Sequence, residues 1–71
     1  MLIKLPNNQN PYILRDLIIT MGDAKRFAAR DMNVDPSTIV LKDKDGYVFQ
    51  DTDHVSKSMK GMMDIIYVHQ L

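Results

Sequence analysis

The chain lacks cysteine and glutamate and has only three glycines in 71 residues. Without cysteine it forms no disulfide bond, iron–sulfur cluster or thiolate zinc site, which fits an intracellular setting. Nine basic side chains balance nine acidic ones, so the net charge gives no general reason to bind nucleic acid or anionic lipid. A single core of this size supplies only about 3–5 kcal/mol, so we expect one compact domain over residues 1–71.

Long hydrophobic runs and targeting segments are also missing. No apolar run approaches the roughly 20 residues that cross a membrane. Lys4, Pro6 and a polar stretch at 7–10 follow the first residues directly, unlike the apolar segment of a signal peptide. We therefore expect a monomeric intracellular protein, nuclear or cytoplasmic, with no membrane contact.

The N-terminal segment favours two strands. Met1, Ile3 and Leu5 share one parity, which is how a strand buries one face. Residues 6–11 are rich in proline and asparagine, which favour a reversal of the chain. The next apolar segment also fits a helix, but the proline before it and the capping signal after it favour a strand from near Tyr12 to near Leu17.

A helix is predicted at about residues 21–33. Thr20 and Asp23 resemble a capping box with the shorter acid, because the hydroxyl can accept from a free amide and the carboxylate lies at the positive helix end. Asp35 precedes Pro36, which favours the end of the helix. Helical spacing places Met21, Ala24, Ala28 and Met32 inward, with Phe27 at their flank, and Arg26 and Arg30 toward solvent.

The C-terminal half returns to strands. Asp45-Gly46 suits a hairpin turn between a strand at residues 39–42 and another at Tyr47–Phe49. The polar residues 51–61 predict a short turn or helical piece. Residues 63–70 are almost continuously apolar, which predicts a last strand in a central position.

This order of elements, ββαβ(β)β, resembles the ubiquitin-like β-grasp, an α+β fold with a mixed sheet of four to five strands and one main helix. The closest resemblance is to the Hub-type group, also called ubiquitin-like protein five, which is associated with the spliceosome. It rests on T-x-G-D-x-K at 20–25, I-V-L-K at 39–42, D-H-V-S at 53–56 and Gly61-Met62 before a last strand that contains tyrosine. It implies non-covalent binding to other proteins in pre-mRNA splicing, with a spliceosomal component bound through a short helical motif.

The chain departs from this group at three places, one of which is that the group's tryptophans around the third strand are absent. The group's paired tyrosine is replaced by Tyr67-Val68. Its acidic residue before the helix threonine, which is thought to pair with an arginine of the partner, is replaced by Ile18 and Ile19. Either the partner differs, or the acid comes from elsewhere, such as Asp16 or Asp23.

A second resemblance is to the ubiquitin-fold modifier. It rests on Pro11-Tyr12 before the second strand, on Phe27–Ala29 in the helix and on the late Asp-Gly turn. That protein is conjugated through a terminal glycine, whereas Gly22, Gly46 and Gly61 are all internal. A conjugated modifier, or a ubiquitin-like domain cut from a longer chain, therefore remains the alternative to the non-covalent factor.

No pattern of catalytic residues and no glycine-rich phosphate loop is found, so we predict no enzyme, no cofactor and no metal. Residues 43–54 resemble a calcium loop but lack its ligand spacing and closing glutamate, which favours a hairpin turn. The basic cluster Lys25, Arg26 and Arg30 lacks interleaved aromatics. It favours a solvated helix face over nucleic-acid binding, and a small RNA-binding module is kept as a further alternative.

Two surfaces are candidates for a protein partner. One is the outward face of the later strands, where the parity of the last strand is open and a slip of one residue exchanges its faces. The other is the edge beside the helix N-terminus, where a helical peptide is expected from the Hub-type resemblance. Met59, Met62 and Met63 either add to a binding surface or fill the core. The candidate residues are Ile18, Ile19, Asp23, Arg26, Arg30, Val40, Lys42, Ile65, Tyr67 and His69.

Overall fold

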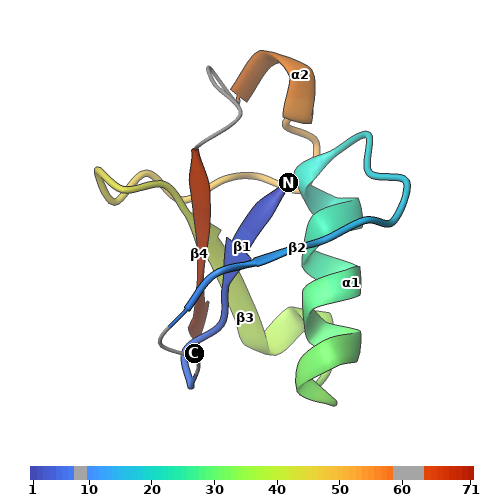
Figure 1. Ribbon diagram of the computed structural model, residues 1–71, viewed down its shortest axis with the longest axis vertical. Helices are drawn as coiled ribbons and strands as arrows, with labels where there is room; N and C mark the ends of the chain where they lie inside the picture. The colour runs from blue at the N-terminus through green and yellow to red at the C-terminus, as the bar shows by residue number, and fades with distance from the viewer. Residues whose placement is uncertain (8–9, 59–63) are drawn as a thin grey trace.

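The computed structural model describes residues 1–7, 10–58 and 64–71, and it shows one main helix packed on a four-stranded mixed sheet (Figure 1). The predicted α+β fold is confirmed, and the arrangement is β-grasp-like. The strands are β1 (Leu2–Lys4), β2 (Tyr12–Ile13), β3 (Ile39–Lys42) and β4 (Ile65–Gln70), and the helices are α1 (Met21–Met32), the 3₁₀ turn η1 (Pro36–Thr38) and the short α2 (Val55–Ser58).

The last strand lies in the middle of the sheet, as its apolar sequence predicts. The strand order is β2-β1-β4-β3, with β4 parallel to β1 and antiparallel to β3. Ile3 pairs with Ile66 across β1 and β4, and Leu41 pairs with Val68 across β3 and β4. These four side chains are almost fully buried, so both neighbours of β4 contribute to the same core.

The core lies between the sheet and α1. On the helix side it consists largely of alanines, and such small side chains bring the helix axis close to the strands. The predicted inward face is confirmed, with Phe27 and Met32 partly buried at its margin, while the buried Ala29 was not predicted. The core residues are Ile3, Leu14, Met21, Ala24, Ala28, Ala29, Ile39, Leu41, Phe49, Ile66 and Val68.

Two predicted strands are shorter in the structure. The strand predicted from Tyr12 to Leu17 ends at Ile13, because its partner β1 begins at Leu2, which pairs with Ile13. Leu17 is instead 84% exposed in the connection to α1. The strand predicted at Tyr47–Phe49 is reduced to a single bridge between Lys42 and Val48. The chain leaves the sheet there to reach the start of α1, although the predicted turn forms with Gly46 at φ 90°.

The two ends of α1 are set by different devices. The predicted capping box forms: the Asp23 amide donates to the Thr20 hydroxyl at 3.3 Å, and the Asp23 carboxylate accepts from the Thr20 amide at 3.1 Å. The predicted helix range of about 21–33 agrees with the structure to within one residue, but the stop is set by Asn33 rather than by Asp35-Pro36. The helix ends at Met32 because Asn33 adopts the left-handed conformation, at φ 59°, and caps the last turn.

Two aspartates at helix N-termini, Asp23 at α1 and Asp35 at η1, make the stability of the fold depend on pH. Backbone hydrogen bonds from Thr20 and Ile19 lower the pKa of Asp23, and bonds from Ser37 lower the pKa of Asp35. A lowered pKa contributes stability above the ordinary aspartate value of about 4, and this contribution is lost as the pH falls through the folded-state pKa. We expect the urea midpoint of the wild type to fall on acidification from pH 5 to pH 2.5, and to fall less in the Asp23→Ala/Asp35→Ala variant. Equal decreases in the two proteins would contradict the assignment.

Candidate partner-binding surface

One face of the sheet points away from α1. Along β3 and β4 the buried residues alternate with partly exposed ones, so the alternate side chains lie on the opposite face from the core. This settles the parity of the last strand: Ile66 and Val68 point toward the helix. The structure therefore gathers Val40, Lys42, Ile65, Tyr67 and His69 on the outer face of the sheet.

Cross-strand pairing arranges this outer face in rows. Tyr67 on β4 lies opposite Lys4 on β1 and opposite Lys42 on β3. The residues of one row sit on adjacent strands, about 4.7–4.9 Å apart, so Lys4 and Lys42 are the two cross-strand neighbours of Tyr67 on this face. Next to this basic row, Leu2 pairs with Ile13 on one side and with Ile65 on the other, which forms an apolar row.

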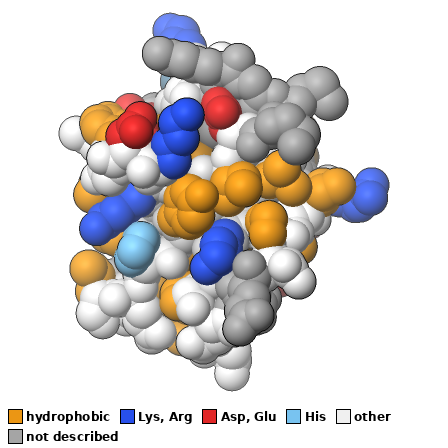
Figure 2. Space-filling model, turned by 60° about the vertical axis from the view of Figure 1, so that its left-hand side comes forward, with side chains coloured by type: hydrophobic (Ala, Val, Ile, Leu, Met, Phe, Trp, Pro, Cys, Tyr) orange, Lys and Arg blue, Asp and Glu red, His pale blue; other side chains and the backbone are white. Residues whose placement is uncertain are grey.

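The outer face exposes apolar surface to solvent. Ile13 is 54% exposed, and Leu2, Ile65 and Tyr67 are partly exposed. Figure 2, which brings the β3–β4 side of the molecule forward, shows hydrophobic side chains gathered in a band with Lys or Arg side chains and a histidine beside them. Sequence reasoning missed Leu2, Lys4 and Ile13, because parity places them outward but only the strand pairing brings them next to Tyr67.

The candidates near the start of α1 have other roles. Ile18 packs against the core. Ile19 is 56% exposed, but its amide donates to the Asp23 carboxylate and its carbonyl accepts from the Val55 amide. Asp23 also pairs with Arg26. These residues fix the entry of the chain into α1, and they do not share a surface with the outer face of the sheet.

The basic cluster of α1 is neutralised by neighbouring acids. Lys25 pairs with Asp51 at 3.3 Å. Arg30 pairs with Asp16 at 3.1 Å and with Asp31 at 3.2 Å, and these contacts raise its pKa, the bond to Asp16 most of all. In contrast, within residues 1–7, 10–58 and 64–71, neither Lys4 nor Lys42 takes part in an ion pair. Both lysines of the outer face are therefore without an ion pair in the described structure, as are Arg15, Lys44 and Lys57 elsewhere on the molecule.

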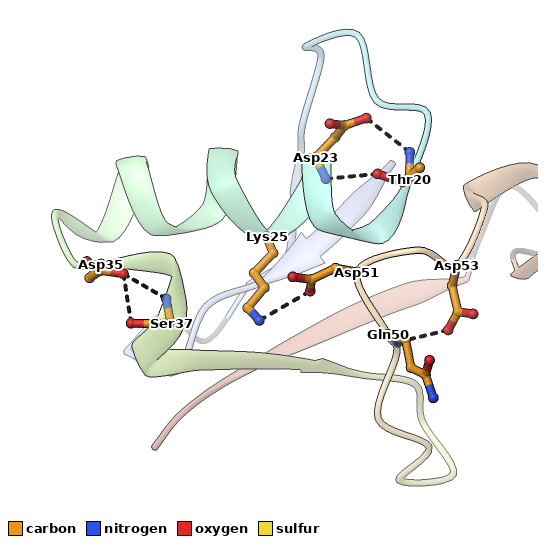
Figure 3. A network of polar contacts seen from close by, with 8 residues as sticks. All are labelled: Thr20, Asp23, Lys25, Asp35, Ser37, Gln50, Asp51 and Asp53. Atoms are coloured by element: carbon orange, nitrogen blue, oxygen red, sulfur yellow. Dashed lines mark hydrogen bonds and ion pairs between the residues drawn. The ribbon is translucent and has the colours of Figure 1, made fainter.

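The loop at residues 50–54, which contains Asp51 and Asp53, accepts hydrogen bonds from the N-terminus of α1. The Met21 amide donates to the Asp53 carbonyl at 2.7 Å, and the Gly22 amide donates to the Asp51 carbonyl at 3.0 Å. The Asp53 carboxylate accepts from the Gln50 amide at 2.9 Å (Figure 3). It also accepts from the Tyr47 hydroxyl, which raises the pKa of Tyr47. In the part of the chain that the structure describes, no three His, Asp or Glu side chains are grouped as a metal site requires.

A shallow hollow lies beside the end of α1, and the sequence does not predict it. It has a volume of about 300 Å³ and is lined by apolar side chains together with the polar residues Asn7, Asp31 and Gln70. Both oxygens of Asp31 are already used: one accepts from the Tyr12 hydroxyl at 2.7 Å and the other from Arg30. Burial, with the bond to Asp31 second, raises the pKa of Tyr12. Asp31 therefore has both carboxylate oxygens engaged within the protein. The residues that line the hollow are Leu5, Pro6, Asn7, Asp31, Met32, Val34 and Gln70.

Comparison of the chain with protein-family models, with curated proteins and with solved structures gave no match in any of the three. Among the residues that the structure describes, no helix has the length and apolar character needed to span a membrane. The suggestion that Met59, Met62 and Met63 add to a binding surface falls outside the described residues. The functional argument therefore depends on the geometry of the outer face.

Proposed function

We propose that this domain is a non-covalent protein-binding factor of the ubiquitin-like type and that the outer face of its sheet is the binding surface. The observation that carries the proposal is the row Lys4, Tyr67 and Lys42 beside the apolar row Ile13, Leu2 and Ile65. It puts a partly exposed aromatic ring, aliphatic side chains and two cations with no ion pair among the described residues on one surface.

The composition of this surface is typical of a protein interface. Tyrosine is enriched at interface positions that contribute most to binding, because it offers a large contact area with few rotatable bonds. Contiguous apolar surface with a polar rim also marks interaction sites in water-soluble domains. Because the side chains come from four paired strands, the surface is preorganised and loses little entropy on binding.

A finer proposal concerns the partner. The Hub-type resemblance favours a protein of the pre-mRNA splicing machinery. The replacement of the group's acid by Ile18 and Ile19 supports a contact other than the arginine ion pair of that group. On this proposal the contact is made by the sheet, where Lys42 and Tyr67 lie side by side across β3 and β4.

A pull-down with three forms of the chain tests both proposals. Tyr67→Ala should lower recovery of the partner at least tenfold, since truncation of a central aromatic often costs 2 kcal/mol or more. Tyr47→Ala is the matched control, because Tyr47 is 52% exposed but lies in the hairpin turn, and it should leave recovery unchanged. Mass spectrometry identifies the captured proteins, and circular dichroism checks that the variants fold.

Each proposal has its own negative result. Equal recovery by wild type and Tyr67→Ala would exclude the outer face as the binding surface. Loss of recovery with Tyr67→Ala, but with no spliceosomal component among the captured proteins, would exclude the splicing role and leave the binding surface in place.

A further inference from the structure

We infer that the outer face of the sheet selects an acidic, partly apolar protein segment, with a carboxylate on either side of an apolar side chain. This inference rests on the proposed function, because it names the chemistry of the partner at the same surface. It depends on three features of that surface: the spacing of Lys4 and Lys42, the lack of an acid at the outward strand positions that the structure describes, and the adjacent apolar row.

The two lysines are held at a fixed spacing. Lys4 and Lys42 each pair directly with Tyr67, one across β1 and β4 and the other across β3 and β4. Two strand spacings of about 4.8 Å place their Cα atoms about 10 Å apart, with the tyrosine ring between them. The short paired strands fix this distance, whereas two lysines on a loop would have no defined separation.

The charge of the two lysines is available to a partner. No outward position of β1, β3 or β4 carries an acid in the described structure. The acid next to Lys42 in sequence, Asp43, accepts from the Asp45 amide at 2.8 Å and from the Tyr47 amide at 2.9 Å in the turn. His69 is exposed two residues beyond Tyr67 on the same face. The surface is therefore locally basic although the chain as a whole carries no net charge.

The apolar row distinguishes a protein segment from nucleic acid. A single RNA strand could stack a base on Tyr67 and contact the lysines through phosphates. The row Ile13, Leu2 and Ile65 offers neither a charge to a phosphate nor an aromatic ring to a base. Aliphatic side chains of a protein segment would cover it and exclude water from it. Carboxylates about 10 Å apart on one face occur seven residues apart in a helix. In an extended segment, same-face carboxylates are two or four residues apart, about 7 or 13 Å, a range that the lysine side chains can span.

Selection from an unbiased library of displayed 16-residue peptides tests the inference, with three proteins as bait. These are the wild type, Lys4→Glu/Lys42→Glu, and the control Lys44→Glu/Lys57→Glu. The control makes the same change in net charge at exposed lysines outside the outer face. We expect wild type and control to enrich the same acidic, apolar peptides, and Lys4→Glu/Lys42→Glu to enrich basic ones. One selected peptide, titrated by NMR, should bind Lys4→Glu/Lys42→Glu about tenfold more weakly and the control within about twofold.

The outcomes separate the inference from the proposed function. Selected peptides without acidic residues, or acidic peptides that bind Lys4→Glu/Lys42→Glu as well as wild type, would overturn the inference alone. Peptides whose binding is unchanged by Tyr67→Ala, or no enrichment at all, would overturn the proposed function as well. If no peptide is enriched and an eight-nucleotide polyuridine binds wild type but not Lys4→Glu/Lys42→Glu, the surface binds RNA instead.

Discussion

Ile66→Ala is expected to unfold most of the protein at neutral pH. Ile66 is 1% exposed at the centre of β4, and it pairs with Ile3 of β1. Replacing a buried isoleucine by alanine costs about 2–5 kcal/mol, because the lost transfer energy is joined by the cost of the cavity. The whole core of a domain of this size supplies only about 3–5 kcal/mol. Urea titration followed by far-UV circular dichroism measures the loss directly.

Two control variants show that the loss comes from burial at the centre of the sheet. Ile66→Val removes one methylene and should cost about 0.5–1.5 kcal/mol, leaving a folded protein with a lower urea midpoint. Leu17→Ala removes more apolar volume than Ile66→Val, but Leu17 is 84% exposed, so the free energy of unfolding should change by no more than about 0.5 kcal/mol. A cost of Ile66→Ala no greater than that of Leu17→Ala would contradict the placement of the core.

The features that the sequence predicts correctly depend on neighbouring residues. Thr20 and Asp23 are three residues apart and cap the helix between them, so the start of α1 is a local property. The inward face of α1 follows from its 3.6-residue period in the same way. The central position of β4 between β1 and β3 agrees with its own apolar run, although only the face with Ile66 and Val68 is covered.

The features that the sequence does not predict depend on residues far apart in the chain. The length of β2 is set by where β1 begins. Residues 47–49 do not form a full strand, because the loop that follows them accepts hydrogen bonds from the first amides of α1. On the candidate surface, the alternation of β1 in the sequence indicates that Lys4 points outward. Its place beside Tyr67 depends on the parallel pairing of β1 with β4, which the sequence does not show. The neutralisation of Lys25 by Asp51, 26 residues away, is of the same kind.

Gly22→Ala is expected to destabilise the protein although alanine favours helices. Gly22 lies in the first turn of α1, where a glycine to alanine change alone would gain up to about 1 kcal/mol. A Cβ at this position would lie 2.9 Å from the Asp51 carbonyl oxygen and 3.1 Å from the Asp51 Cβ. This oxygen is a backbone atom that accepts a hydrogen bond from the Gly22 amide, so the whole loop must move to relieve the contact. We expect a net loss of about 1–3 kcal/mol, as for overpacking in a core, measured by urea titration.

Gly46→Ala separates this steric effect from backbone strain. Gly46 has φ 90°, a conformation that alanine rarely adopts, yet nothing lies within 4 Å of its ideal Cβ. Gly46→Ala should therefore lower the free energy of unfolding by about 1–2 kcal/mol and change NMR chemical shifts only in the turn. Gly22→Ala should instead increase hydrogen exchange at the amides of Met21 and residue 22 and weaken the Lys25–Asp51 pair, because both depend on the same loop. If Gly22→Ala is as stable as wild type with unchanged exchange, the close packing of residues 50–53 on α1 is wrong.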